Sequence, residues 1–310
     1  MSLAALQEIQ SLNVPRGTIL TIGTFDGVHR GHQAIISAVV NRAKKEGLLS
    51  GCITFKDSPR QTLRPGTPFY YLMALQERID VLAGLGLDVV LPLTFDTDLA
   101  SVEAERFIGY LVDNLNLKHL IVGPDFALGY KRKGTIEVIK KIGQDRGFTV
   151  ESISSTNISD GRVSSTRLRE LLSEIGDVAS ANELLGRPYS IESVVKKGHQ
   201  RGQTIGYRTA NLDVPSNRII PLDGVYVTST TLGENIYRSV TNIGDNPTFG
   251  DKMTSVETYI LDFDQMIYDE TIKVEFLHRV RGEIKFESVD KLTEQIAADV
   301  EITREYFSKH

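Results

Sequence analysis

Cysteine is almost absent from the 310 residues, because Cys52 is the only one. A single thiol excludes an intramolecular disulfide and any zinc or iron–sulfur site that needs several cysteines. Basic charge is also in short supply: 35 Lys and Arg face 40 Asp and Glu, for a net charge of −5. No positive excess therefore draws the chain to nucleic acid or to an anionic membrane surface. We expect neither nucleic acid nor a membrane as a partner.

Long hydrophobic runs are missing as well. No segment approaches the roughly 18 consecutive apolar residues that a membrane helix needs, and 1–15 lacks the basic and apolar regions of a targeting signal. The sequence also has no low-complexity tract and no internal repeat. We therefore expect a cytoplasmic protein, and its length predicts two domains. The sequence does not specify an oligomeric state.

The first half alternates strand and helix patterns. Short β-branched and apolar runs predict strands at 18–22, 51–55, 88–93, 119–123 and 148–153, and helical spacing predicts helices at 32–45, 72–85, 101–115, 135–144 and 165–173. This alternation is typical of βαβ units and a parallel sheet. Ligands of such sheets bind at the carboxyl ends of strands, here in the loops after Ile22, Phe55, Leu93 and Gly123.

The pattern changes after Leu185. Short runs separated by turn residues predict strands at 190–196, 224–230, 236–243, 257–261 and 271–280. They indicate a small β-barrel or sandwich, closed by an amphipathic helix over 290–306. The predicted domains are therefore 1–185 and 186–310.

The first chemical motif, Gly-Thr-Phe-Asp-Gly-Val-His-Arg-Gly-His, spans 23–32 and joins the first strand to the first helix. Its glycines let the backbone approach a ligand closely, and a helix N-terminus attracts phosphate. His29 and His32 are three residues apart, so both point to one side of the first helical turn, where they can bind phosphate oxygens. One packed and one solvated histidine is the alternative. No Gly-Lys-Ser/Thr follows, which excludes a Walker A loop.

The segment 23–33 resembles the signature of the nucleotidylyltransferase superfamily. More narrowly, it resembles the adenylyltransferase half of the bacterial bifunctional riboflavin kinase/FMN adenylyltransferase (FAD synthetase) family. The run Val-Ser-Ser-Thr-Arg-Leu-Arg at 163–169 is similar to that family's Ser-Ser-Thr-x-x-Arg motif, whose hydroxyls can cap a helix facing phosphates. The resemblance implies ATP contacts from Gly23, Phe25, Asp26, Gly31, Ser165 and Thr166, and catalytic roles for His29, His32 and Arg169.

Two other segments of this half resemble the flavin side of the family's site. Gly-Pro-Asp-Phe-Ala-Leu-Gly at 123–129 and Thr-Phe at 54–55 imply flavin contacts from Phe55, Asp125 and Phe126. The family continues with Pro-His-Pro after the residue that follows Phe55, whereas this chain has Asp57 and Ser58 before Pro59. Because proline restricts a loop, we expect this loop to hold FMN less rigidly.

The second half resembles the riboflavin kinase module. Its glycines at 198, 202 and 206 can surround phosphates with backbone N–H groups. The following Gly-Tyr-Arg-Thr-Ala-Asn is similar to the family's Gly-Phe-Pro-Thr-Ala-Asn. Thr209 and Asn211 share one face of an extended strand and offer hard oxygen ligands that suit Mg²⁺ bound to phosphates. The resemblance implies ATP or flavin contacts from Gly198, Gly202, Gly206, Thr209, Asn211 and Arg281, with Thr209 and Asn211 as metal ligands.

The remaining kinase segments are Asn-Ile-Gly-Asp-Asn-Pro-Thr-Phe at 242–249 and Val-Glu-Thr at 256–258. Glu257 occupies the place of the family's catalytic carboxylate, which can orient a primary hydroxyl and accept its proton. Two departures are Gln203, where a basic residue is common, and Arg208, which replaces proline.

The family resemblance covers roughly residues 18–306 and implies both fold and function. The fold is a Rossmann-like nucleotidylyltransferase domain followed by a small riboflavin-kinase-like barrel with a C-terminal helix. The function is ATP- and Mg²⁺-dependent conversion of riboflavin to FMN, followed by adenylyl transfer that gives FAD and pyrophosphate. One alternative is a monofunctional FMN adenylyltransferase whose second domain binds flavin but is catalytically weak. The other is a flavin-binding regulator or scaffold without activity.

Overall fold

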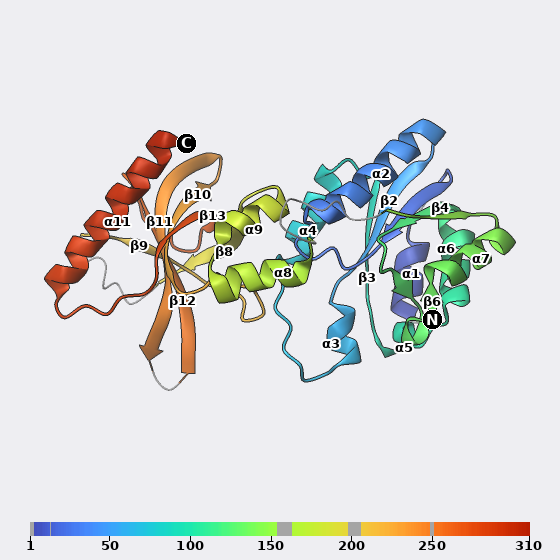
Figure 1. The fold of residues 1–310 in the computed structure, drawn as a ribbon, viewed down its shortest axis with the longest axis horizontal. Helices are drawn as coiled ribbons and strands as arrows, with labels where there is room; N and C mark the ends of the chain where they lie inside the picture. Colours follow the sequence, from blue (N-terminus) through green and yellow to red (C-terminus); the bar gives the residue numbers. More distant parts are fainter. Residues whose placement is uncertain (1–2, 13, 154–162, 198–205, 249–250) are drawn as a thin grey trace. The chain divides into compact units, whose positions relative to one another are not determined.

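The chain folds into two compact units, 1–165 and 166–310, in a computed structural model that describes residues 3–12, 14–153, 163–197, 206–248 and 251–310 (Figure 1). Each unit has its own sheet and its own core. The predicted combination of an α/β domain with a small β domain is confirmed.

The first unit is built on a five-stranded parallel sheet. Its strands are β1 (Thr18–Ile22), β2 (Leu49–Phe55), β3 (Val89–Leu93), β4 (Leu117–Val122) and β7 (Thr149–Ser152), in the order β3-β2-β1-β4-β7. From β1 the chain first adds strands on one side, to β3, and then adds strands on the other side, beginning with β4. This switch point is where doubly wound sheets bind ligands, and the loops after β1 and β4 flank it.

Helices cover both faces of this sheet (Figure 1). On one face lie α2 (Arg30–Glu46) and α4 (Leu75–Gly84), and on the other lie α1 (Leu3–Gln10), α6 (Ala104–Leu115) and α7 (Ile136–Arg146). Strand β1 shows the period-2 pattern that such layering needs. Ile19 packs into the core under α2 and α4, whereas Leu20 and Ile22 pack into the core under α1, α6 and α7. The shorter elements are α3 (Pro59–Leu63), α5 (Thr97–Ala100), the strands β5 (Ala127–Leu128) and β6 (Gly134–Thr135), and the 3₁₀ turn η1 (Tyr130–Arg132).

Three helical segments begin the second unit. They are α8 (Ser165–Arg169), the π-helix η2 (Glu170–Ile175) and α9 (Val178–Leu185). The Leu222 amide donates to the Leu172 carbonyl at 2.8 Å, and the Asn182 side chain bridges the Tyr189 amide and the Phe276 carbonyl. The compact units thus divide twenty residues before 185, where the sequence pattern changes, because these helices pack on the strands that follow them. The boundary at 185/186 stays a prediction about domains.

Six strands close the antiparallel barrel of the second unit. They are β8 (Tyr189–Lys196), β9 (Thr209–Leu212), β10 (Gly224–Leu232), β11 (Asn235–Thr248), β12 (Asp251–Ile260) and β13 (Thr271–Arg281), in the order β10-β11-β12-β9-β8-β13. The C-terminal helix α11 (Val289–Lys309) packs on the outside, where Val300 joins Val225, Val240 and Leu261 in one cluster. Of the barrel and the sandwich, the barrel is correct.

Candidate active sites

The loop that follows β1 carries an unusual backbone. Phe25 and Val28 have φ values of 50° and 39°, in a region that side chains rarely adopt, and Gly27 between them has φ 85°. A Cβ at Gly23 would lie 2.9 Å from the Phe25 ring, so a larger residue there would force the ring to shift. Strain of this kind persists where the surrounding structure enforces it, and it is concentrated at functional sites.

The two histidines of this loop stack on one another. Their ring centroids are 3.6 Å apart with an interplanar angle of 15°, and Phe25 meets the His32 ring edge-on at 5.0 Å. His29 is the N-cap of α2, where its Nδ1 accepts the His32 backbone N–H at 3.3 Å. An accepting Nδ1 leaves the proton of a neutral imidazole on Nε2, so His29 presents a donor. The predicted same-side arrangement of the pair is confirmed.

His32 is held neutral by its surroundings. Burial holds the pKa of His32 well below its usual value, and the nearby His29 lowers that pKa further. Its buried Nδ1 has no hydrogen-bond partner in the described part of the chain. Gly31 leaves room for this arrangement, since a Cβ there would lie 3.2 Å from the His29 ring. A buried ring nitrogen without a partner is costly unless a ligand satisfies it.

Asp26 ties the loop to more distant segments through its side chain and its backbone. Its carboxylate accepts the Leu72 amide at 3.1 and 3.2 Å, and its carbonyl accepts the Ser165 hydroxyl at 2.8 Å. Asp26 is 2% exposed, so this carboxylate shapes the loop from within. Beyond Ser165, Thr166 is exposed and Arg169 half-buried on α8.

Aromatic side chains gather after the strands on the α6 side of the sheet. Phe55, Phe95 and Phe126 are all partly buried against that core, and the rings of Phe55 and Phe95 meet edge-on at 5.3 Å. Asp125 is exposed, and its carbonyl accepts a guanidinium N–H of Arg132 at 3.0 Å. Phe95 had no motif to mark it in the sequence, although it follows the third strand directly.

The segment with the departures from the family pattern is anchored by hydrogen bonds. The Ser58 amide donates to the Tyr71 hydroxyl at 2.8 Å, and that hydroxyl donates to the Gln61 side chain at 2.5 Å. The Ser58 hydroxyl caps α3, and Ser58 is only 3% exposed. Asp57 is exposed.

In the barrel, register places four polar residues in one row. Asn211 pairs with Glu257, Glu257 with Asn242, Asn242 with Val225, and Val225 with Arg281. The neighbours of Glu257 along β12, Val256 and Thr258, are buried, so Glu257 lies on the outer face of the barrel. The Thr209 hydroxyl donates to Glu257 Oε2 at 3.2 Å. Residues separated by up to 70 positions in the sequence are thus aligned in one row across five strands.

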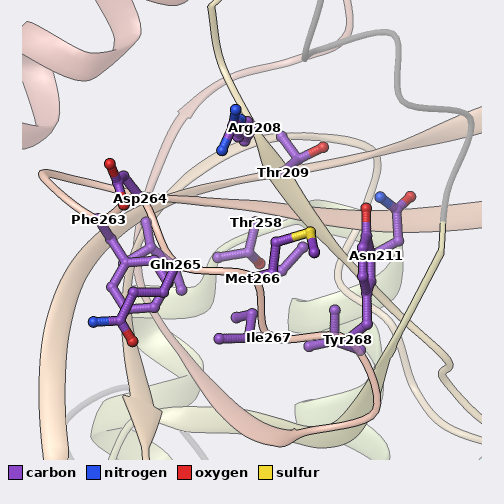
Figure 2. Close-up of a pocket in the computed structure, with 13 residues that line it drawn as sticks. Arg208, Thr209, Asn211, Thr258, Phe263, Asp264, Gln265, Met266, Ile267 and Tyr268 are labelled. Carbon is purple, nitrogen blue, oxygen red and sulfur yellow. The ribbon is translucent and has the colours of Figure 1, made fainter.

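An open cavity of ≈ 140 Å³ lies beside this row (Figure 2). One wall comes from the short strand β9 and the residue before it, with Arg208, Thr209 and Asn211. The other comes from the loop at 263–268, whose Met266 and Tyr268 are exposed. No sequence motif marks this loop, which becomes a wall of the cavity only when the barrel closes.

The structure describes only some of the remaining predicted kinase residues. Gly198 and Gly202, together with Gln203, lie outside the described residues, whereas Gly206 is exposed with φ 85°. Arg281 is engaged: its Nε and one terminal nitrogen donate to the buried Asp299 of α11 at 2.8–3.1 Å.

Comparisons with known proteins identify the family of the whole chain. The family model of FAD synthetase matches residues 11–167, and that of riboflavin kinase matches residues 185–307. The chain is 38% identical to the bifunctional riboflavin kinase/FMN adenylyltransferase of Haemophilus influenzae, over 95% of this chain and 96% of the relative. This chain belongs to the bifunctional riboflavin kinase/FMN adenylyltransferase family.

Another member supports the same assignment, and one solved structure shares the fold of the whole chain. The family member from Bacillus subtilis is 35% identical over 94% of this chain and 93% of its own length. A crystal structure described as a macrolide-efflux protein from Streptococcus pneumoniae matches with a TM-score of 0.89 and 34% identity, covering 98% of each chain. Among the residues described in this bifunctional family member, no helix combines the length and the apolar character needed to cross a membrane. The family predicted from the motifs is confirmed.

Proposed function

We propose that this chain makes FMN and then FAD in two separate sites. In the barrel, the ribityl 5′-hydroxyl of riboflavin attacks the γ-phosphorus of ATP, and ADP leaves. In the first unit, a phosphate oxygen of FMN attacks the α-phosphorus of a second ATP, and pyrophosphate leaves. The hydrogen bond from Thr209, beside the cross-strand row, to Glu257 within it carries this proposal, because it joins a metal-type ligand to a carboxylate in the second unit.

Adenylyl transfer is assigned to the loop after β1. A triphosphate and the negative charge of its departing pyrophosphate would be stabilised here by three groups. These are the Nε2–H of His29, the Nδ1 of His32 and the N-terminus of the 17-residue helix α2. Gly23 and Gly31 let the nucleotide approach the backbone, with Phe25 and Asp26 shaping the loop between them. Ser165 is assigned to the same phosphates, and Thr166 and Arg169, the latter as a cationic fork, stay ATP contacts that the family motif predicts.

The flavin of this reaction is assigned to the aromatic side chains after β2 and β4. Phe55 and Phe126 offer apolar area for a ring, and the exposed Asp125 offers polar atoms beside it. No covalent intermediate with the protein is needed. Catalysis rests on holding the FMN phosphate in line with the α-phosphorus and on stabilising charge.

Riboflavin phosphorylation is assigned to the row around Glu257. The carboxylate accepts the proton of the 5′-hydroxyl while the new O–P bond forms and the bond to the β-phosphate breaks. The cavity beside Thr209 and Asn211 is assigned to the nucleotide, and the exposed guanidinium of Arg208 supplies positive charge to its wall. Gly198, Gly202 and Gly206 remain proposed phosphate contacts. Arg281 fixes the end of the row by its ion pair with Asp299.

Mg²⁺ fits the oxygen ligands that Thr209 and Asn211 offer beside Glu257. The Thr209 hydroxyl donates a hydrogen bond to Glu257, which leaves the lone pairs of the hydroxyl oxygen available, and Asn211 has a side-chain carbonyl oxygen on the same face. The described residues contain no cluster of three or more His, Cys, Asp or Glu side chains. Two neutral oxygens are the type of site in which Mg²⁺ is shared with nucleotide phosphates. When bound there, Mg²⁺ would neutralise phosphate charge.

Product separation tests this function directly. The chain is incubated with riboflavin, ATP and Mg²⁺, and separately with FMN, ATP and Mg²⁺. Formation of both FMN and FAD from riboflavin is expected. FAD from supplied FMN alone would favour the monofunctional adenylyltransferase, for which the departure at Arg208 argues. No product in either incubation would leave a flavin-binding regulator.

A further inference from the structure

Arg78 is the most deeply buried arginine in the described part of the first unit. It lies in the first turn of α4 and is 1% exposed. Arginine is almost never fully buried without partners that satisfy its charge. The contacts of this guanidinium therefore show what the buried charge does.

The guanidinium of Arg78 binds backbone carbonyls at the ends of two neighbouring strands. One terminal nitrogen donates to the Thr24 carbonyl at 2.9 Å. The other donates to the carbonyls of Phe55 and Lys56, at 2.5 and 3.2 Å. Its Nε has no partner among the described residues. The first contact holds the loop after β1, and the other two hold the segment after β2.

These two chain segments carry the two halves of the proposed adenylyl-transfer site. Thr24 directly precedes Phe25 and leads to the stacked histidines. Phe55 and Lys56 begin the segment assigned to the flavin. The Thr54 hydroxyl also donates to the Thr24 carbonyl, at 3.0 Å, so the same oxygen accepts from both sides.

The residues just before α4 also link the two loops. The Leu72 amide donates to the Asp26 carboxylate on the phosphate side, and the neighbouring Tyr71 hydroxyl accepts the Ser58 amide on the flavin side. Together with Arg78, one short stretch of chain contacts both loops. A strained loop needs such external contacts to keep its conformation.

We propose that Arg78 is a positioning residue for FAD formation, which sets the distance between the phosphate loop and the flavin loop. This role rests on the proposed adenylyl-transfer site. The planar guanidinium reaches carbonyls of both strand ends at once, which the compact ammonium of lysine cannot do. Arg78 has no assigned contact with either substrate. Its loss should therefore disturb the alignment of the reacting groups more than the binding of each substrate.

Three variants separate positioning from simple stability. Arg78→Met keeps the length of the side chain without its donors, and Arg78→Lys keeps the charge. Leu82→Ala is the matched control, because Leu82 is fully buried on the same helix, and its side chain packs in the apolar core but has no hydrogen-bond donor for a carbonyl of either loop. Riboflavin phosphorylation, assigned to the second unit, measures the amount of intact protein in every sample. FAD formation from FMN is assayed well below each variant's unfolding temperature.

For Arg78→Met we expect kcat for FAD formation to fall about 10²-fold with smaller changes in both KM values, as for a misplacement of roughly 1 Å. Arg78→Lys should recover part of that loss. Leu82→Ala should unfold at a lower temperature yet keep its kcat. Equal losses in Arg78→Met and Leu82→Ala, or a kcat of Arg78→Met close to that of the unaltered chain, would overturn the inference. An unaltered chain that forms no FAD would overturn the proposed function together with it.

Discussion

Replacing Glu257 by glutamine tests the kinase assignment with the smallest change of shape. Glu257 lies on the outer face of β12 between Asn211 and Asn242, and its Oε2 accepts the Thr209 hydroxyl at 3.2 Å. The amide oxygen of glutamine can accept the same hydrogen bond, so the row should keep its geometry. The amide cannot accept the proton of the riboflavin hydroxyl. General-base catalysis contributes about 10²–10⁴-fold, so we expect FMN formation to fall at least ~10²-fold.

The assay follows FMN formed from riboflavin and, separately, FAD formed from supplied FMN. The second activity should persist, because it is assigned to the other unit. Glu275→Gln is the matched control: Glu275 also lies on a barrel strand, but it pairs with Lys273 and accepts the Ser229 hydroxyl away from the row. This control should keep both activities.

Two results would refute the reasoning about Glu257. In the first, the folded variant loses both activities to a comparable extent, which would remove the division of labour between the units. In the second, the variant phosphorylates riboflavin at a near-normal rate, so Glu257 is a solvated strand residue. A KM rise for riboflavin with unchanged kcat would assign Glu257 to binding rather than to proton transfer.

Three other predictions concern the first unit. His32→Ala should lower FAD formation by about 10²-fold or more, as for loss of a group that stabilises transition-state charge, while FMN formation persists; a near-normal rate would mean that His32 only packs. Because the pKa of His32 is lowered in the folded state, only the unfolded chain takes up this proton as pH falls below about 6.5. The free energy of unfolding should therefore fall between pH 7 and 5.5, by up to ~1.4 kcal/mol per pH unit. Denaturant titrations of His32→Ala should lack this slope, and a slope that persists in the variant would contradict the assignment. Asp57→Pro combined with Ser58→His should change the KM for FMN or the rate of FAD formation several-fold, with oxidised or with reduced FMN, since ordering a loop is worth ~1 kcal/mol. No change in either redox state would exclude this loop as a determinant of FMN binding.

Local pattern was sufficient for the elements that form the sheet. The strand at 18–22 was predicted with the bounds of β1, because its five residues are all buried and therefore apolar or β-branched. Helix α2 runs from Arg30 to Glu46 around the predicted 32–45. The His pair could be predicted too, since residues three apart at a helix start lie on one side.

Other elements depend on contacts that a sequence pattern does not contain. The helix α1 was not predicted, although Ala5 and Ile9 are completely buried against the sheet. Its eight residues are too few for a clear periodic pattern. The cavity wall at 263–268 and the row around Glu257 form only through the register of distant strands. Arg78 looks like any solvated helix arginine in the sequence, and only burial shows otherwise.

The loop after β2 shows how a missing motif can be replaced by tertiary contacts. The absence of Pro-His-Pro predicted a looser loop, since proline reduces conformational freedom before folding. In the structure, the amide of Ser58 donates to the Tyr71 hydroxyl, and the carbonyl of Lys56 accepts from Arg78. A hydrogen-bonded loop of this kind depends on the packing of α4, whereas a proline-rich loop carries its stiffness in the covalent chain. The flavin side of this site should therefore respond to changes in α4 that a proline-stiffened loop would tolerate.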